Sequence, residues 1–268
     1  MKIKKRNFNI ILGSILSGIV LVPALIGLFV TPYDPETMDA AAKLSGISIT
    51  HIMGCDNFGR DIFSRVMAGS SVIMIIAGVT VLIGVIIGTL IGAFSGYYGG
   101  VFDEITMRIN DALFTFPSIL LALTFISLFG SGKYQVMLAL GIAFIPSYAR
   151  IVRSEFIRCK NMDYVKSAKL AGAGDLRIMF VHILPNAFSV LSSSILIGFN
   201  NAVLAEAGLS FLGIGVQPPD ASLGRMLSEA QTYLFSAPTY ALFPGIAIII
   251  MILGITLLSE GLKEVKSC

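Results

Sequence analysis

The stretch SSVIMIIAGVTVLIGVIIGTLIGAF, residues 70–94, contains no charged residue and decides the fold class. A transmembrane helix needs about 20 mostly apolar residues, because a rise of about 1.5 Å per residue must cover roughly 30 Å of hydrocarbon. This stretch meets both requirements. Gly84, Gly88 and Gly92 are spaced four apart within it, which places them near one face of a helix that a second helix can approach closely.

The composition of the whole chain agrees with this local pattern. Of 268 residues, 55% are hydrophobic and only 13% are charged, and the mean hydropathy is +0.85. A soluble domain is usually about 45–50% apolar and about 25% charged. The composition therefore indicates an integral membrane protein. The net charge of +3 is too small to indicate a nucleic-acid partner.

Apolar stretches of similar length recur along the chain. We expect membrane spans over about residues 8–30, 70–94, 105–129, 134–152, 187–207 and 240–259. Basic residues precede the first stretch, as in a secretory signal, but the apolar run is too long and no small-residue cleavage site follows it. The sequence therefore predicts an all-α integral membrane protein of about six transmembrane helices. We expect one domain over residues 1–268, with an uncleaved first span and a five-span core over about residues 70–260.

The distribution of Lys and Arg predicts the orientation. Cytoplasmic loops carry an excess of these residues, and most of the 19 Lys and Arg residues fall before the first span, in the segment 153–186 and after the last span. We therefore expect both termini in the cytoplasm, one large cytoplasmic loop over about residues 153–186, and an external segment over about residues 31–69.

Residues that could carry metal, redox or nucleotide chemistry are few. Cys55, Cys159 and Cys268 are widely spaced and only two histidines are present, so neither a disulfide framework nor a metal site is expected. Residues 130–133, GSGK, look like the end of a phosphate-binding loop, but the earlier glycine and the following Ser or Thr are missing. We expect no cofactor and no ATP site on this chain.

The cytoplasmic loop is the most informative segment for function. Residues 163–171 can form a short helix, Gly172 can adopt backbone angles that end it, and Asp175 suits the start of the next helix. Two short helices at an angle would form a rigid knob that can dock into a groove on a cytosolic partner. An ordinary basic loop that faces anionic lipid headgroups is the alternative.

This loop resembles the cytoplasmic signature of binding-protein-dependent ABC importer permeases. That signature is a Glu-Ala-Ala triplet, a Gly four residues later and a Leu-Pro downstream, which correspond here to Lys166-Ser167-Ala168, Gly172 and Leu184-Pro185. Two triplet residues depart from the pattern, and Lys166 replaces an acid that could pair with the ATPase. The resemblance assigns ATPase coupling to a set of loop residues, namely Lys166, Ser167, Ala168, Gly172, Ala173, Asp175, Leu176 and Pro185.

Further motifs resemble the dipeptide, oligopeptide and nickel branch of these permeases. They are Pro32-Tyr-Asp-Pro35, Gly54-Cys-Asp-Asn-Phe-Gly-Arg-Asp61, Met107-Arg-Ile-Asn-Asp111 with Phe116-Pro117, and Glu206-Ala-Gly-Leu-Ser-Phe-Leu-Gly-Ile-Gly-Val-Gln-Pro-Pro219. Cys55 stands where the branch usually has Thr. The resemblance covers about residues 30–262, and several motifs in the right order are far more specific than one.

The resemblance implies a permease subunit of an ATP-driven importer in the bacterial cell membrane. Its implied partners are a second homologous permease, two cytosolic ATPase subunits that use ATP and Mg, an extracytoplasmic substrate-binding protein and the lipid bilayer. The implied cargo is a di- or oligopeptide, with nickel or a metal chelate as the alternative. The chain itself is then not an enzyme, because ATP hydrolysis belongs to the partner subunits.

Two acids fall within or beside the predicted spans. Charges inside a bilayer are costly and usually face a partner or water. Asp111 is expected either to contact Arg108, one helical turn away, or to lie at the membrane interface, and the alternative is that it takes part in the translocation path. Glu206, near the outer end of the fifth span, either braces the following loop or faces the substrate path.

Four charged residues of the external segment, Asp56, Arg60, Asp61 and Arg65, fall at helical spacing. Such spacing fits a salt-bridged amphipathic helix that lies against the outer leaflet. The alternative is a contact with the substrate-binding protein.

Two other classes of membrane protein are weighed against the importer. An ion-driven secondary transporter is expected to show inverted repeats or broken helices with buried ion ligands, and no clear internal repeat is present. A membrane-embedded enzyme would need a paired nucleophile and base, or metal ligands, within the spans. His182 and the scattered acids do not supply that pairing.

Overall fold

The computed structural model of the chain describes residues 2–266, with side chains from residue 8 to residue 261. Cys268 lies outside the described residues. Helices are the main regular elements of the described chain: α1 (Lys2–Gly27), α2 (Ile62–Tyr98), α3 (Gly100–Phe114), α4 (Ser118–Phe129), α5 (Lys133–Cys159), α6 (Asp163–Leu170), α7 (Asp175–Arg177), α8 (Leu184–Phe211), α9 (Leu223–Ala230) and α10 (Pro238–Lys266).

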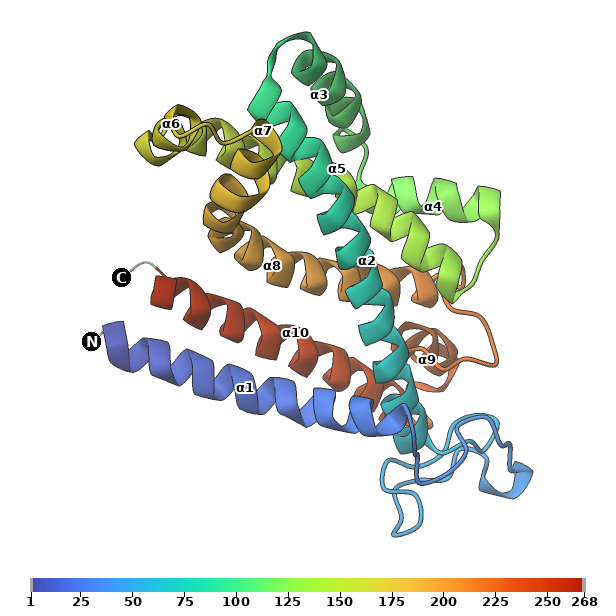
Figure 1. The fold of residues 1–268 in the computed structure, drawn as a ribbon. Coiled ribbons are helices and arrows are strands. Elements are labelled where there is room, and N and C mark those ends of the chain that lie inside the picture. Colours follow the sequence, from blue (N-terminus) through green and yellow to red (C-terminus); the bar gives the residue numbers. More distant parts are fainter. Residues whose placement is uncertain (1, 267–268) are drawn as a thin grey trace.

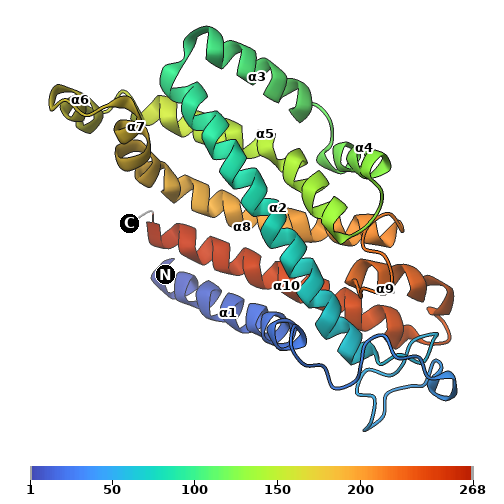
Figure 2. The ribbon, with the colours of Figure 1, turned by 45° about the vertical axis from the view of Figure 1, so that its right-hand side comes forward.

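The long helices form a bundle that α2 crosses (Figures 1 and 2). α1 packs against α10, α10 packs against α8, and α2 packs mainly against α5. Both termini lie at one end of the bundle, on the same side as α6 and α7 (Figures 1 and 2). The loop between α1 and α2 lies at the opposite end. The end with α6 and α7 is named the hairpin end, after the hairpin that these two helices form, and the end with the α1–α2 loop is named the loop end.

Five helical segments within residues 2–266 are long and apolar enough to cross a membrane: Phe8–Gly27, Ile62–Tyr98, Lys133–Cys159, Asp175–Phe211 and Pro238–Gly261. α3 and α4 pass the same test only as a pair, and the pair is bent by 88°. The predicted class, an all-helical membrane protein of about six spans, is confirmed.

The expected continuous span over residues 105–129 is wrong. α3 ends at Phe114 and α4 begins at Ser118, with Pro117 in an extended conformation at the start of α4. Proline has no N–H to donate and disfavours the helical conformation of the residue before it. The Phe116-Pro117 pair therefore separates the two helices, although the apolar pattern continues across it.

Helix boundaries also differ from those expected. α2 begins at Ile62, within the segment expected to be external, and α5 continues to Cys159, within the expected cytoplasmic loop. The helix after the loop begins at Asp175 and runs to Phe211. Within the loop expected over residues 153–186, only short connections on either side of α6 are therefore non-helical. The apolar stretch of sequence ends where the bilayer ends, but a helix continues as long as its backbone groups and side chains find partners.

The expected amphipathic helix through Asp56 and Arg60 does not form. Gly54 and Gly59 adopt positive φ angles of 80° and 77°, which turn the chain. The Asp56 carboxylate accepts the backbone N–H groups of Phe58 and Arg60, at 2.8 and 2.9 Å. Short side chains that bond to nearby backbone groups favour turns over helices. The charged residues of this segment are nevertheless paired, as described below.

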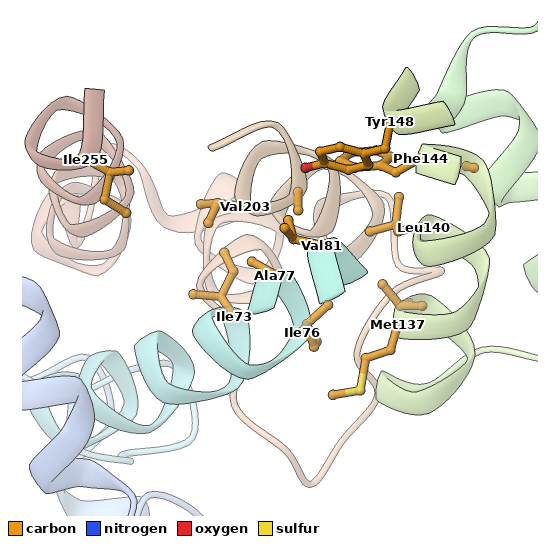
Figure 3. Close-up of a cluster of buried hydrophobic side chains, with 14 of the residues drawn as sticks. Ile73, Ile76, Ala77, Val81, Met137, Leu140, Phe144, Tyr148, Val203 and Ile255 are labelled. Carbon is orange, nitrogen blue, oxygen red and sulfur yellow. The ribbon is translucent and has the colours of Figure 1, made fainter. Parts of the chain in front are cut away.

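The glycine face of α2 forms a close helix contact. A Cβ atom on Gly88 would lie 2.7 Å from Tyr148 Cβ, and one on Gly92 would lie 2.4 Å from the Ala149 carbonyl oxygen. The expected close approach of a second helix is therefore confirmed, and that helix is α5. Apolar side chains of α2, α5, α8 and α10 meet in the core (Figure 3), among them Ile73, Val81, Leu140, Phe144, Val203 and Ile255.

Candidate functional site

The segment 160–177 forms a compact hairpin of α6 and α7, and this segment is named the hairpin. α6 ends in a Schellman motif: the Ala173 N–H donates to the Ala168 carbonyl, and the Gly172 N–H donates to the Lys169 carbonyl, both at 3.0 Å. Such a motif requires a left-handed residue, usually glycine, four residues after the first acceptor. Gly172 fills that position with φ of +83°. The spacing from Ala168 to Gly172 thus has a direct backbone explanation.

The hairpin is anchored on its inner side and exposed on its outer side. Val165 is 1% exposed, and Ala168 and Ala173 pack against the core. Leu170 and Leu176, on either side of the turn, are 90% and 59% exposed. Large apolar side chains at the tip of an otherwise polar loop are typical of surfaces that contact another protein.

The triplet positions Lys166 and Ser167 lie on the exposed face of α6. The Lys166 ammonium pairs with the Asp163 carboxylate one turn earlier, at 3.0 Å. Both side chains are largely exposed, so this pair contributes little to stability. Lys166 is therefore free to exchange Asp163 for an acid on another protein.

Asp175 begins α7 as expected and joins the hairpin to α2. Its carboxylate accepts a hydrogen bond from the Tyr97 hydroxyl at 2.6 Å. α7 then continues through a π-helical stretch, Ile178–Ile183, into α8, which carries Pro185 in its first turn. The Leu184 N–H bonds to the Met179 carbonyl five residues earlier. This wider turn accommodates a proline, which would otherwise clash with a carbonyl of the preceding helical turn.

A cavity of about 480 Å³ opens between α4, α5 and α8. It combines apolar walls with hydroxyl and amide groups, and none of the described residues that line it is charged. The polar lining residues are Ser118, Ser147, Tyr148, Ser194 and Asn201. A concave, mostly apolar surface with a few polar groups is the usual form of a small-molecule site.

Neither acid predicted for the translocation path lines this cavity. Asp111 pairs with Arg150 of α5 at 2.6 Å, while Arg108 pairs with Glu104, so the expected Arg108–Asp111 contact is wrong. Arg108 reaches back to Glu104, one turn towards the N-terminus of α3, and Asp111 contacts α5 instead.

Glu206 is fully buried in α8 and holds the connection that leads to α9. Its Oε1 atom accepts hydrogen bonds from the hydroxyls of Ser210, at 2.7 Å, and Ser222, at 3.0 Å. The Ser210 hydroxyl in turn accepts the Val216 N–H at 3.0 Å. The bracing role predicted for Glu206 therefore agrees with its contacts.

At the loop end, the four charged residues predicted for the external segment are buried and paired. Asp56 bonds to Arg60 at 2.6 Å and lies 3.5 Å from Arg65. Arg60 also reaches Glu229 of α9 at 3.1 Å. Asp61 caps α2 by accepting the Ser64 N–H at 2.8 Å. This group, extended by Arg225 and Tyr240, is named the loop-end network.

Electrostatics within the loop-end network favour the charged form of Glu229. Burial alone would raise the pKa of this carboxyl, but hydrogen bonds from Tyr240 and Arg225 and the nearby charges of Arg65 and Arg60 hold its pKa below its usual range. Within the described residues, no cluster of His, Cys, Asp and Glu is arranged to hold a metal ion.

Several residues of these sites escaped sequence reasoning. Ser147, Ser194 and Asn201 interrupt apolar spans, and polar groups within a membrane span are a recognised signal of a path or cavity. Leu176 was included in the coupling set by the family resemblance, but Leu170 gave no signal, because an exposed leucine cannot be told from a buried one by sequence alone. Tyr97 stands at the end of an apolar run, and nothing in the sequence indicates its contact with the hairpin.

Comparisons with known proteins agree in family and in fold. Residues 84–265 match the family model described as "Binding-protein-dependent transport system inner membrane component". A protein of Brucella suis biovar 1 (strain 1330), named "Putative peptide transport system permease protein", is 40% identical over 262 residues, which is 98% of this chain and 88% of that protein. The glutathione transport system permease protein GsiD of Salmonella typhimurium is 40% identical over 264 residues, 98% of this chain and 87% of that protein.

A solved structure with the same fold agrees with this assignment. It shows the MetNI methionine ABC transporter in inward-facing conformations, and one of its chains superposes with a TM-score of 0.60 at 16% sequence identity. The match covers 76% of this chain and 95% of that chain. At this identity the likeness supports the shared architecture and not a shared cargo.

Proposed function

The chain belongs to the family of binding-protein-dependent transport system inner membrane components and is a permease subunit of an ABC importer, and from this premise we propose that it imports short peptides. The names of two relatives, a peptide and a glutathione transport permease, support this cargo class. The uncharged cavity between α4, α5 and α8 also supports it, because hydroxyl and amide groups can bond to peptide backbone without selecting a side-chain charge.

The exposed hairpin is the observation that carries the coupling part of this proposal. A knob with a fixed turn at Gly172 and with Leu170 and Leu176 at its tip can insert into a groove on a cytosolic ATPase. The hairpin end then faces the cytoplasm and the loop end faces outward. The basic residues of the hairpin end, among them Arg158, Lys160 and Lys169, support the same orientation.

In the proposed cycle the chain moves but performs no chemistry. Two ATPase subunits, which use ATP and Mg, grip the hairpins of this chain and of a second homologous permease. Their closure on ATP biases the permease pair between two conformations, and the hairpin carries the coupling free energy between the ATP site and the path. An extracytoplasmic binding protein delivers the peptide at the loop end, and hydrolysis resets the pair.

The test is copurification of a tagged chain from native membranes in mild detergent, followed by an ATPase assay with candidate cargoes. We expect a second permease and ATPase subunits in the complex, and ATPase activity that glutathione or a dipeptide stimulates through its binding protein. Stimulation by a nickel chelate instead would replace peptide by metal as the cargo. Recovery of this chain alone, where other membrane complexes stay whole, would contradict the proposal.

Substitutions at two glycines of the hairpin, one as the test and one as its control, examine the coupling role. A Cβ atom placed on Gly172 or on Gly174 would meet no other atom within 4 Å, but Gly172 has φ of +83° and Gly174 has φ of −70°. A β-branched residue is strongly disfavoured at positive φ and unstrained in the extended region. We expect Gly172→Val to lose most of the copurified ATPase and Gly174→Val to retain it. Equal recovery would remove the hairpin from the coupling role.

A further inference from the structure

Tyr97, the penultimate residue of α2, is the point at which this helix meets the hairpin. Its hydroxyl donates to Asp175 of α7 at 2.6 Å. The Lys169 ammonium of α6 lies 5.3 Å from the centre of its ring, and the Lys160 ammonium donates to its backbone carbonyl at 3.3 Å. The ring itself is buried, with 8% of the residue exposed. Three separate positions of the hairpin thus converge on one residue of α2.

The glycine face of α2 connects this helix to the cavity through Tyr148. Gly84 and Gly88 of α2 lie against the Tyr148 side chain, within 3.0 and 2.7 Å of a Cβ atom placed on each glycine. Tyr148 lines the cavity, and its hydroxyl approaches Gly198 of α8 on the other side. A closely packed interface of this kind shifts as a unit rather than deforming gradually. A displacement of α2 would therefore move a wall of the cavity.

We propose that Tyr97 is a positioning residue for transport, whose hydroxyl holds Asp175 so that movement of the hairpin is passed through α2 to Tyr148 and the cavity. This inference rests on the proposed ATPase-coupling function of the hairpin. The Tyr97 hydroxyl is the element that distinguishes rigid transmission from simple packing, because the ring alone would let the hairpin slide over the end of α2. A hydrogen bond to a charged group is among the stronger polar contacts in proteins.

The experiment reads the cavity directly and needs no knowledge of the cargo. Ser147, an exposed residue of the cavity lining, is replaced by cysteine, and Cys268 is replaced by serine, whereas Cys55 and Cys159 are buried. The complex with its ATPase subunits is placed in lipid vesicles. The rate of labelling by a small maleimide is then compared with and without ATP and Mg.

We expect ATP to change the labelling rate in the otherwise wild-type complex, and we expect Tyr97→Phe to reduce that change about 5-fold or more, the lower end of typical allosteric couplings. ATPase recovery and ATP hydrolysis should persist in Tyr97→Phe. Tyr98→Phe, at an adjacent and largely exposed ring, should respond as wild type. Asp175→Ala should reproduce the loss, and Asp175→Asn, which keeps an acceptor oxygen, should restore most of the response.

The outcomes separate this inference from the proposed function. A wild-type complex without ATPase subunits would overturn the proposed function and the inference with it. A wild-type complex that contains ATPase but shows no response at Ser147→Cys would overturn the transmission route. A full ATP-dependent labelling response in both Tyr97→Phe and Asp175→Ala would overturn only the positioning role of Tyr97. The proposed function as an ATPase-coupled permease would stand.

Discussion

The two ends of the bundle carry similar kinds of charged residues but use them in opposite ways. At the loop end, Asp56 and Arg65 are almost completely buried, at 0% and 2% exposure, and they bind the α1–α2 loop to α2. At the hairpin end, Asp163 and Lys166 pair on an open surface. Buried pairs fix geometry, because breaking one leaves an uncompensated charge, whereas exposed pairs exchange partners freely. The loop end is therefore rigid, and the hairpin is available to a partner.

The largest expected effect comes from breaking the buried set. Asp56→Ala should lower the free energy of unfolding by about 3–5 kcal/mol, because it leaves the Arg60 and Arg65 guanidinium groups buried with one remaining acid, Glu229. Thermal unfolding of the purified protein in detergent measures this loss. Asp163→Ala, the matched carboxylate at the hairpin end, should leave the melting temperature unchanged. Similar shifts in the melting temperatures of Asp56→Ala and Asp163→Ala would contradict the difference between the two ends.

Glu206 gives an intermediate effect at the loop end. Glu206→Ala should lower the free energy of unfolding by about 1–3 kcal/mol, because the buried hydroxyls of Ser210 and Ser222 lose their shared acceptor. Glu206→Gln keeps an acceptor oxygen in the same place and should stay close to wild type. Melting temperatures of the two variants decide the matter. If Gln is as harmful as Ala, the negative charge and not the hydrogen bonds of Glu206 would be the requirement.

The smallest expected effect is a pH dependence that originates at the loop end. The pKa of Glu229 is held below its usual range, so its ionised form stabilises the fold at pH values above the unfolded pKa of about 4.3, and this stability is lost as the pH falls through the folded pKa. The melting temperature of the wild type should therefore fall on acidification below about pH 5. Glu229→Gln should melt lower at neutral pH and show a shallower acid slope. An unchanged slope would assign the acid sensitivity to other carboxyls.

The sequence predicts the hairpin end better than the loop end, and the physical reason is locality. The turn at Gly172 depends on backbone bonds between residues five apart or closer, so spacing alone predicts it. The loop-end network joins Arg60 to Glu229, which are 169 residues apart, and no local pattern can indicate such a pair. Helical spacing of the charges even suggested a helix where glycines at positive φ turn the chain.

The fold class was predictable because the bilayer imposes length and apolarity on every span. The break at Pro117 was missed because hydropathy does not register a proline, although the residue itself was visible. The cavity needs three helices from distant parts of the sequence, so its lining could be suggested only by isolated polar residues such as Asn201. The proposed coupling from Tyr97 to Tyr148 depends on packing, of which the sequence indicates only the glycine face of α2 through Gly84 and Gly88.

The most direct test of the central claim, that the hairpin docks an ATPase while the loop end does not, is chemical cross-linking at one exposed apolar residue from each end. Leu170→Cys and Ile49→Cys, both largely exposed in the free chain, are each introduced with Cys268→Ser and treated in native membranes with a short thiol-reactive cross-linker. We predict that Leu170→Cys captures an ATPase subunit, identified by its mass, and that Ile49→Cys captures none. Capture of the ATPase at Ile49→Cys, or its absence at Leu170→Cys in a transport-competent complex, would contradict the claim.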